Sequence, residues 1–183
     1  MPVVSAVEPN LLVVIARRPA VSAVGRIACG HLREAMISRA ILERRISEFI
    51  ALDQDQESLD HIAETYTQHN IRIVNGSVRA VISGAVKLGG FNLIYAAGLY
   101  DYLVDRVAAR LTAATFDMLV SGGRLLVANF APTGRDIAYM EKFMRWKLIY
   151  RTEDDIMRLA GGIVPESIRL QDFSAMHTRM SSA

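Results

Sequence analysis

Apolar and polar positions alternate along this chain so that a short apolar run is followed, five times, by a segment with helical spacing. The apolar runs are residues 24–28, 46–52, 71–74, 91–96 and 124–129. Nearly continuous runs of this length are typical of strands buried on both faces of a sheet. The alternation therefore predicts a single α/β domain over 1–183, a doubly wound, mostly parallel, Rossmann-like sheet with helices on both faces.

The helical segments between these runs are predicted at 32–44, 55–66, 78–85 and 104–118. The segment after Asp55 is the clearest, because its apolar residues fall at i, i+3, i+4 and i+7: Leu59, Ile62, Ala63 and Tyr66. Paired glycines follow two of the helices, and we expect Gly89-Gly90 and Gly122-Gly123 to end them.

The two ends of the chain have weaker patterns. Residues 1–23 are predicted to cover the domain, either as part of a helix over a cofactor site or as an irregular cover over a sheet edge. Residues 133–160 are predicted to form a helical lid, with a helix over 135–146 and a capping box at Thr152–Asp155 that opens another. Two final strands are predicted at 163–170 and 173–180. Antiparallel pairing of a C-terminal strand is one of the arrangements that the pattern allows.

The first strand–helix–strand unit contains the two clearest candidate residues for ligand binding. Gly30 lies in the turn after the first strand, and Asp53 lies at the tip of the second. Both strand tips open on the same edge of a parallel sheet. A glycine lets the backbone approach a ligand closely, and an acceptor-only carboxylate can bind both hydroxyls of a ribose. The spacing therefore predicts a nucleoside site, whereas a plain turn and a helix cap are the alternative reading of the same two residues.

Composition narrows the function further. With 51% hydrophobic and 22% charged residues, the chain can bury a large core. A net charge of +2, without a run of lysine or arginine, does not favour nucleic acid. The single cysteine, Cys29, excludes an internal disulfide and fits a reducing compartment. No apolar run is long enough to span a membrane, so we expect a cytoplasmic protein.

From residue 24 onward the chain resembles the class I S-adenosylmethionine-dependent methyltransferases. The run 26–32, Arg-Ile-Ala-Cys-Gly-His-Leu, resembles their first-strand motif, an acid followed by G-x-G-x-G, although only the middle glycine is kept. The runs 49–55, 74–78, 91–94 and 121–127 resemble their later motifs, with Ser-Gly-Gly-Arg-Leu at 121–125 the closest. The pairing of A-C-G-H-L-R-E with A-G-L-Y-D-Y-L resembles a bacterial subgroup of the family.

The resemblance implies S-adenosylmethionine as the cofactor. Asp53 would then bind the ribose, its neighbour Gln54 would lie over the adenine, and Ser77 would accept a bond from the adenine amino group. The residues that the resemblance assigns to the cofactor are Ala28, Cys29, Gly30, Asp53, Gln54, Ser77, Val78 and Ala96. No metal is expected.

The methyl acceptor is expected beyond the carboxyl end of the fourth strand, where open α/β sheets bind ligands. The candidate catalytic residues are Tyr100, Asp101 and His31. The candidate substrate-binding residues are Tyr95, Tyr100, Tyr102, Arg145 and Trp146. A cap for the following helix is the alternative reading of Asp101, and a plain turn residue that of His31.

The sequence therefore predicts an S-adenosylmethionine-dependent methyltransferase with a small-molecule acceptor, without nucleic acid or membrane partners and with a homodimer left open. Two other classes are weighed against it. One is a methyltransferase-like module that binds or assembles without catalysis. The other is an NAD-dependent dehydrogenase, which requires G-x-G-x-x-G, whereas Ala28, Gly30 and Arg33 occupy those places here.

Overall fold

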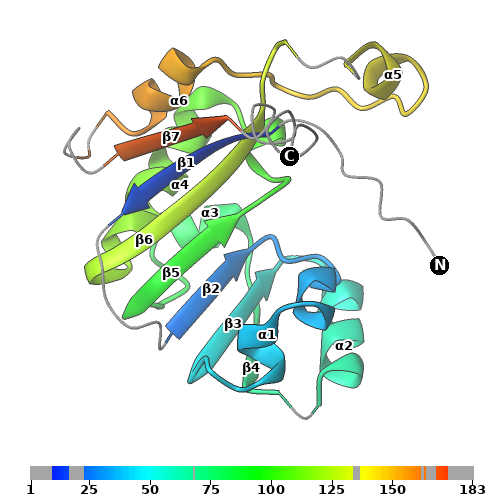
Figure 1. The fold of residues 1–183 in the computed structure, drawn as a ribbon, viewed down its shortest axis with the longest axis vertical. Coiled ribbons are helices and arrows are strands. Elements are labelled where there is room, and N and C mark those ends of the chain that lie inside the picture. Colours follow the sequence, from blue (N-terminus) through cyan, green and yellow to red (C-terminus); the bar gives the residue numbers. More distant parts are fainter. Residues whose placement is uncertain are drawn as a thin grey trace, which may run out of the picture.

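A seven-stranded sheet in the order β4-β3-β2-β5-β6-β1-β7 organises the computed structural model (Figure 1). The structure describes residues 10–16, 23–67, 69–133, 137–161, 163 and 168–172. The strands are β1 (Asn10–Ala16), β2 (Ala23–Ile27), β3 (Glu48–Asp53), β4 (Ile71–Asn75), β5 (Phe91–Ala96), β6 (Leu119–Phe130) and β7 (Ile168–Asp172). The five strands from β2 to β6 pair in parallel, which confirms the predicted Rossmann-like sheet.

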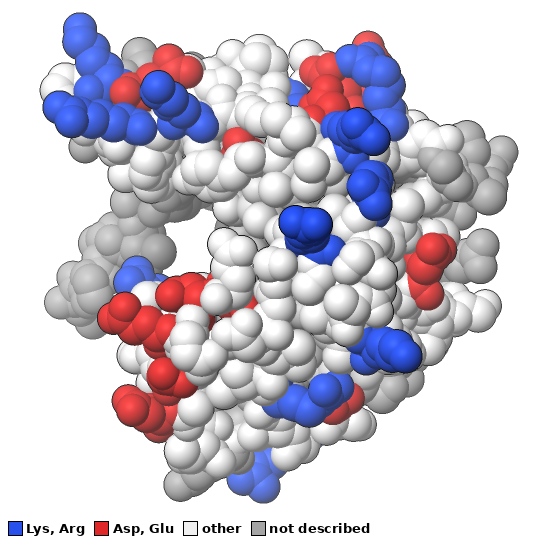
Figure 2. All heavy atoms as spheres, turned by 180° about the vertical axis from the view of Figure 1, so that it is seen from behind, with Lys and Arg blue, Asp and Glu red and all other residues white. Residues whose placement is uncertain are grey.

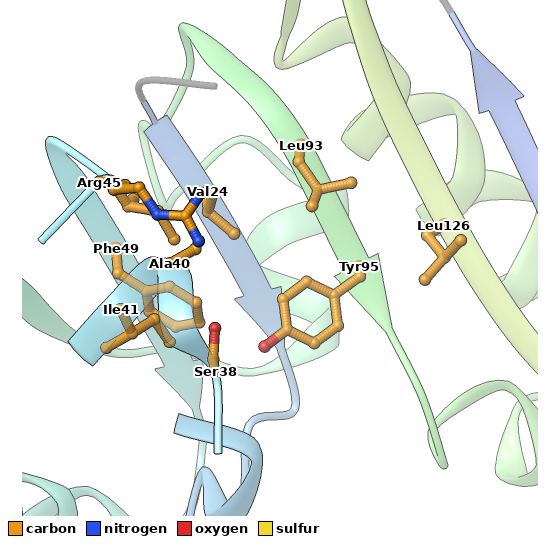
Figure 3. Close-up of a pocket in the computed structure, with 10 residues that line it drawn as sticks. Val24, Ser38, Ala40, Ile41, Arg45, Phe49, Leu93, Tyr95 and Leu126 are labelled. Atoms are coloured by element: carbon orange, nitrogen blue, oxygen red, sulfur yellow. The ribbon is translucent and has the colours of Figure 1, made fainter. Parts of the chain in front are cut away.

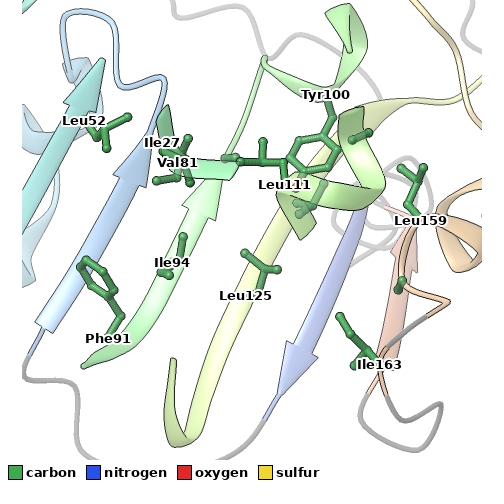
Figure 4. Packing of buried hydrophobic residues seen from close by; sticks show 14 of the residues in the cluster. Ile27, Leu52, Val81, Phe91, Ile94, Tyr100, Leu111, Leu125, Leu159 and Ile163 are labelled. Atoms are coloured by element: carbon green, nitrogen blue, oxygen red, sulfur yellow. The ribbon is translucent and has the colours of Figure 1, made fainter. Parts of the chain in front are cut away.

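Helices lie on both faces of this sheet (Figure 1). They are η1 (Arg33–Met36), α1 (Arg39–Leu42), α2 (Gln56–Thr65), α3 (Val78–Ile82), η2 (Tyr100–Tyr102), α4 (Asp105–Asp117), α5 (Ile137–Lys142) and α6 (Glu153–Leu159). One core cluster unites α3, α4 and α6 with the sheet through Val81, Leu111 and Leu159 (Figure 4). A second cluster packs η1, α1 and α2 against the other face of the sheet through Ala35, Ile41 and Leu59. None of the described helices is long and apolar enough to cross a membrane.

The N-terminal segment corrects a prediction. Residues 10–16 are neither a helix nor an irregular cover but strand β1, inserted between β6 and β7 and antiparallel to both. The apolar run 11–16 finds its partners more than 100 residues away, at 124–129, and no local pattern reveals such a pairing. Of the two predicted final strands, the first overlaps β7 at Ile168–Asp172, which continues through the turn expected at 171–172. The second predicted strand lies outside the described residues.

The predicted helix over 32–44 is also wrong. The structure has a single 3₁₀ turn, η1, and a single α-helical turn, α1, in its place. Leu32, which precedes η1, has a left-handed backbone with φ of 50°, and Ile37 between the two turns is 81% exposed. The apolar residues of this segment therefore do not share one buried face, and a continuous helix has too little packing to stabilise it.

The prediction that Gly122 and Gly123 end a helix is wrong. Both lie inside β6, and the preceding helix, α4, ends at Asp117. A Cβ built on Gly123 would lie 2.7 Å from the backbone oxygen of Phe91, so the glycine is needed for close approach of β5 and β6. The β5–β6 register shifts at the same point, between Phe91 and Leu93. The glycine pair marks an irregularity in the sheet, which is another common role for glycine within a strand.

Replacing Gly123 by alanine is therefore expected to lower the free energy of unfolding by about 2 kcal/mol or more, because the backbone carbonyl of Phe91 cannot move aside cheaply. Chemical denaturation measures this change. Gly89→Ala is the control, because a Cβ there would lie 4.0 Å from its nearest neighbour, the backbone oxygen of Met118. If Gly123→Ala were as stable as Gly89→Ala, the close approach of β5 and β6 would be contradicted.

The capping box before α6 is confirmed. The Thr152 side chain accepts a hydrogen bond from the Asp155 amide, and the Asp155 carboxylate accepts one from the Thr152 amide at 2.8 Å. The bonds that the Asp155 carboxylate accepts from the Thr152 hydroxyl and from the Thr152 amide hold the pKa of Asp155 below its usual value. The helix predicted at 135–146 is shorter in the structure, where α5 spans Ile137–Lys142 and an extended segment leads from it to α6 (Figure 1).

Candidate functional site

The tips of β2 and β3 meet at the carboxyl edge of the sheet. The Gly30 amide donates a hydrogen bond to Oδ2 of Asp53 at 2.8 Å, across 23 residues of sequence. The other carboxylate oxygen, Oδ1, accepts a bond from the Asp55 amide at 3.0 Å. Asp55 in turn caps α2 by accepting from Ser58, which lowers the pKa of the Asp55 carboxyl. The turn and the acidic tip thus form one rigid unit.

The turn after β2 has the positive φ angles typical of glycine at three positions, although only one of the three is a glycine. Ala28, Gly30 and Leu32 have φ of 53°, 50° and 50°. L-residues adopt this left-handed conformation at a cost of about 1–2 kcal/mol each. The side chain of Leu32 offsets this cost because it is buried in the core, whereas Ala28 has only a methyl group. Strain of this kind persists where the surrounding structure requires a special backbone path, and it is concentrated at functional sites.

Ala28→Gly is expected to raise the free energy of unfolding by up to about 1 kcal/mol, because relief of the left-handed strain exceeds the added entropy of the unfolded chain. Thermal or chemical denaturation measures the effect. Ala109→Gly, within α4, is the matched control and should be destabilising by about 1 kcal/mol, because its helical backbone suits alanine. Destabilisation of both variants would show that Ala28 is not strained.

Beside the turn, Arg26 occupies the place where the resembling family has an acid. Its Nε lies 2.9 Å from Oε1 of Glu34, and its Nη1 donates to the backbone oxygen of Ala97 at 3.2 Å. The Tyr95 hydroxyl donates to the same Glu34 oxygen at 2.9 Å, and the guanidinium lies 4.9 Å from the centre of the Tyr95 ring. Burial and the neighbouring Glu34 raise the pKa of Tyr95. Glu34 therefore places a negative charge beside Arg26, at the strand position where the family motif has an acid.

Two other residues of the turn have distinct environments. Cys29 is buried, and burial together with the charge of Asp53 raises its pKa to about 12, so its thiol stays protonated at neutral pH. It contributes its backbone to the site, not a nucleophile. His31 is exposed, and its ring meets that of His61 on α2 edge to face, with 4.8 Å between the ring centres.

The residues expected on the adenine side lie along the same edge. Gln54 is exposed next to Asp53, and Ser77 caps α3 by accepting from the Ala80 amide at 3.2 Å. Val78 follows at the start of α3, half-buried. Ala96 ends β5 and is buried in the core, so its side chain offers almost no exposed surface to a ligand.

Two candidate residues for the acceptor side are buried instead. Tyr100 is 1% exposed, and its hydroxyl hydrogen-bonds Thr112 of α4 at 3.0 Å. Burial raises the pKa of Tyr100 to about 12, against the opposing effect of this hydrogen bond. Asp101 is also 1% exposed and accepts a bond from the Phe130 amide at 2.7 Å. It does not cap α4, whose N-cap is Val104. Burial raises the pKa of Asp101. Neither side chain can touch a ligand. Tyr100 fixes the η2 segment against α4, and Asp101 fixes it against β6.

The other acceptor candidates remain at the surface. Tyr102 is 55% exposed at the end of η2, and Trp146 is 38% exposed in the segment that follows α5. Arg145, next to Trp146, is exposed and has a left-handed backbone with φ of 53°. In Figure 1, α5 stands over the carboxyl edge of the sheet, opposite the end of β3 and the start of α2.

A buried arginine that no sequence pattern singled out connects these elements. Arg151 is 1% exposed, and its guanidinium donates to the backbone oxygens of Tyr100 and Leu103 and to the side chains of Asn129 and Asp105. Nη1 of Arg151 lies 2.7 Å from the backbone oxygen of Tyr100 and 2.6 Å from Oδ1 of Asn129. The segment after β5 is thereby held against the end of β6. The sequence shows only an arginine before a capping box, with no sign of its burial.

Acidic and basic side chains form two separate groups near this edge of the sheet (Figure 2). Acidic side chains gather over α2, where Glu57, Asp60 and Glu64 are exposed, and basic side chains gather near α5, where Lys142 and Lys147 are exposed. The two groups face each other across a recess in the surface. The acidic side would repel a phosphate at the ribose position, so a nucleoside without a 2′-phosphate suits it better. The described residues contain no group of three or more side chains able to hold a metal ion.

Comparison with known proteins identifies the fold. No family model and no curated protein matches the chain. Among solved structures it is similar to a TehB-like S-adenosylmethionine-dependent methyltransferase from Corynebacterium glutamicum, with a TM-score of 0.55, 18% identity and coverage of 79% of this chain and 65% of that one. It is also similar to LepI in complex with S-adenosylmethionine, with a TM-score of 0.59, 14% identity and coverage of 79% and 38%.

A third similar structure is CalS10 with S-adenosylmethionine bound, an amino pentose methyltransferase from Micromonospora echinaspora. Its TM-score is 0.50 and its identity 17%, with coverage of 60% of this chain and 43% of that one. The chain thus spans between 38% and 65% of the lengths of these three proteins. Its fold is that of the class I S-adenosylmethionine-dependent methyltransferases.

Proposed function

We propose that the chain is an S-adenosylmethionine-dependent methyltransferase that acts on a small molecule. The observation that carries the proposal is the direct hydrogen bond between the Gly30 amide and Asp53, because it places a strained turn and a carboxylate side by side at the carboxyl edge. Open α/β sheets bind nucleotides at this edge, where the strand order reverses. Here the order reverses at β2, whose neighbours are β3 and β5.

The residues present fit an adenosine. Each oxygen of Asp53 already accepts one backbone amide, at 2.8 Å and 3.0 Å. A carboxylate offers about four acceptor positions, so about two remain for the ribose hydroxyls. Among the described residues the Ser77 hydroxyl accepts one bond, from the Ala80 amide, and a hydroxyl has further capacity for a polar group of the base.

When bound, the cofactor would supply a methyl group activated by its sulfonium. The chain would then need to orient the acceptor and exclude water from it. Tyr102, Arg145 and Trp146 are exposed, and we expect these three side chains to contact the acceptor. His31 is the remaining candidate for proton removal, since Tyr100 and Asp101 are buried. The similar structure CalS10, described as an amino pentose methyltransferase, supports a small-molecule acceptor.

A second candidate is a methyltransferase-like module that binds the nucleoside without catalysis. Two observations favour it: the burial of Tyr100 and Asp101, and the pairing of Glu34 with Arg26. An NAD-dependent dehydrogenase has less support, because no glycine follows at the third place of its phosphate loop, which Arg33 occupies.

Isothermal titration calorimetry separates these candidates. For either the enzyme or the binding module, S-adenosylmethionine is expected to bind with micromolar affinity and NAD⁺ to give no heat. Transfer of a labelled methyl group to a panel of small hydroxyl, amine and carboxylate compounds then distinguishes the enzyme from the module. If NAD⁺ bound and S-adenosylmethionine did not, the proposed function would be wrong.

A further inference from the structure

One face of the sheet is covered unevenly by the described helices. On the face that carries η1, α1 and α2, these elements pack over β2, β3 and β4. Beside them a cavity of about 700 Å³ opens between α1 and the partly buried side chains of β5 and β6 (Figure 3). A volume of this size is within the range of small-molecule sites.

The walls of this cavity are apolar, with polar groups only at its borders. The apolar walls come from β2, β3, β5 and β6 and from the α1 region: Val24, Phe49, Leu93, Leu126, Ala40, Ile41 and Ile46. Tyr95 closes one side with its ring, while its hydroxyl is bonded to Glu34. Ser38 and Arg45 supply the other polar groups of the lining, and Figure 3 shows the Arg45 guanidinium extending over Val24.

The strand register places a second arginine beside the cavity. Val24 of β2 pairs with Leu93 of β5, and Leu93 pairs with Arg124 of β6. Arg124 is two residues from Leu126, so the two side chains project from the same face of the sheet. Arg124 is exposed, and it forms no ion pair with another residue of the described ranges. Arg45 pairs with Glu43, where both side chains are more than half exposed.

The charges around the cavity favour an anion. The segment 33–45 contains four arginines and two glutamates, Glu34 and Glu43. Both glutamates are already in ion pairs, with Arg26 and Arg45. Arg45 extends over Val24, and Arg124 lies in the same row of the sheet as Val24 and Leu93, so positive charge borders one end of the apolar walls. None of the described residues that line the cavity carries a carboxylate.

We propose that this cavity binds an amphipathic carboxylate, with its hydrocarbon part on the apolar walls and its carboxylate at the arginine border formed by Arg45 and Arg124. The site is separate from the turn at Gly30 and does not depend on the proposed methyl transfer. Burial of the hydrocarbon supplies the affinity, and the arginines select for negative charge.

Titration of laurate below its micelle concentration, followed by calorimetry and by amide NMR shifts, tests the site in the full chain. Laurate is expected to bind and to shift the amides of Leu93, Tyr95 and Leu126. Dodecyltrimethylammonium, which has the same chain with the opposite charge, is expected to bind at least about tenfold more weakly. The double variant Arg45→Glu and Arg124→Glu should reverse this preference, whereas Arg110→Glu, an exposed charge reversal on α4, should leave it unchanged.

Three results would overturn the proposal. The two amphiphiles could bind equally, which would make the cavity an apolar surface without charge selection. Laurate could shift amides elsewhere, or none. The chain could sediment as a dimer that Leu126→Asp dissociates, which would show that a second copy covers the face. Because S-adenosylmethionine plays no part in these measurements, they are independent of the proposed function.

Discussion

Replacing Arg151 by methionine is expected to lower the free energy of unfolding by about 3–5 kcal/mol. The side chain is buried, and it satisfies the backbone oxygens of Tyr100 and Leu103 and the amide oxygen of Asn129. Methionine fills much of the volume but leaves these acceptors without a donor inside the protein, and each costs about 1–3 kcal/mol. For a chain of this size the melting temperature should fall by about 10 °C, measured by calorimetry or circular dichroism.

Two variants make this expectation specific. Arg151→Lys keeps the charge but cannot reach all four partners from one ammonium group, so it should also be destabilising, by about 2 kcal/mol. Arg158→Ala removes a mostly exposed arginine that pairs with Asp155 on the same helix, and it should change stability by less than about 1 kcal/mol. Equal melting temperatures for Arg151→Lys and wild type would show that the charge alone matters and not the set of hydrogen bonds.

Asp53→Asn is expected to weaken S-adenosylmethionine binding about 10- to 100-fold, which corresponds to about 1.5–3 kcal/mol. Asparagine keeps one carbonyl oxygen for the Gly30 amide but loses the charge and acceptor capacity proposed for the ribose hydroxyls. Calorimetric titration measures the affinity, and a melting curve without ligand shows that the variant remains folded.

Asp60→Asn is the matched control, because it removes the same charge from an exposed position of α2 near the edge. It should change the affinity by less than about threefold, as expected for a screened surface charge. If the two variants bound S-adenosylmethionine equally well, Asp53 would not hold the ribose, and its bond to Gly30 would serve only to brace the turn.

Much of the fold could be predicted from local pattern. The five apolar runs became parallel strands in the expected order of strand and helix, because a strand buried on both faces requires apolar side chains at nearly every position. Leu59, Ile62 and Tyr66 are buried as their spacing predicts, although Ala63 of the same predicted face is exposed. The capping box at Thr152 opens a helix as predicted. These features depend on contacts within a few residues, so the sequence shows them directly.

The errors have a common cause. The helix expected over 32–44 has the right apolar content, but its residues Met36 and Ile37 find no surface to pack against and remain exposed. Gly122 and Gly123 occur where a helix could end, yet the approach of β5 decides that they lie within a strand. In each case a distant element selected between two local structures that the sequence allows.

By itself the sequence determined the strand–helix alternation and the proximity of Gly30 and Asp53, because successive parallel strands bring their tips to one edge. Only the tertiary structure decided that Tyr100 and Asp101 are buried, that Glu34 faces Arg26, and that Arg151 joins three segments. The physical reason is that burial and pairing of polar groups depend on which surfaces meet, and these surfaces come from residues tens of positions apart.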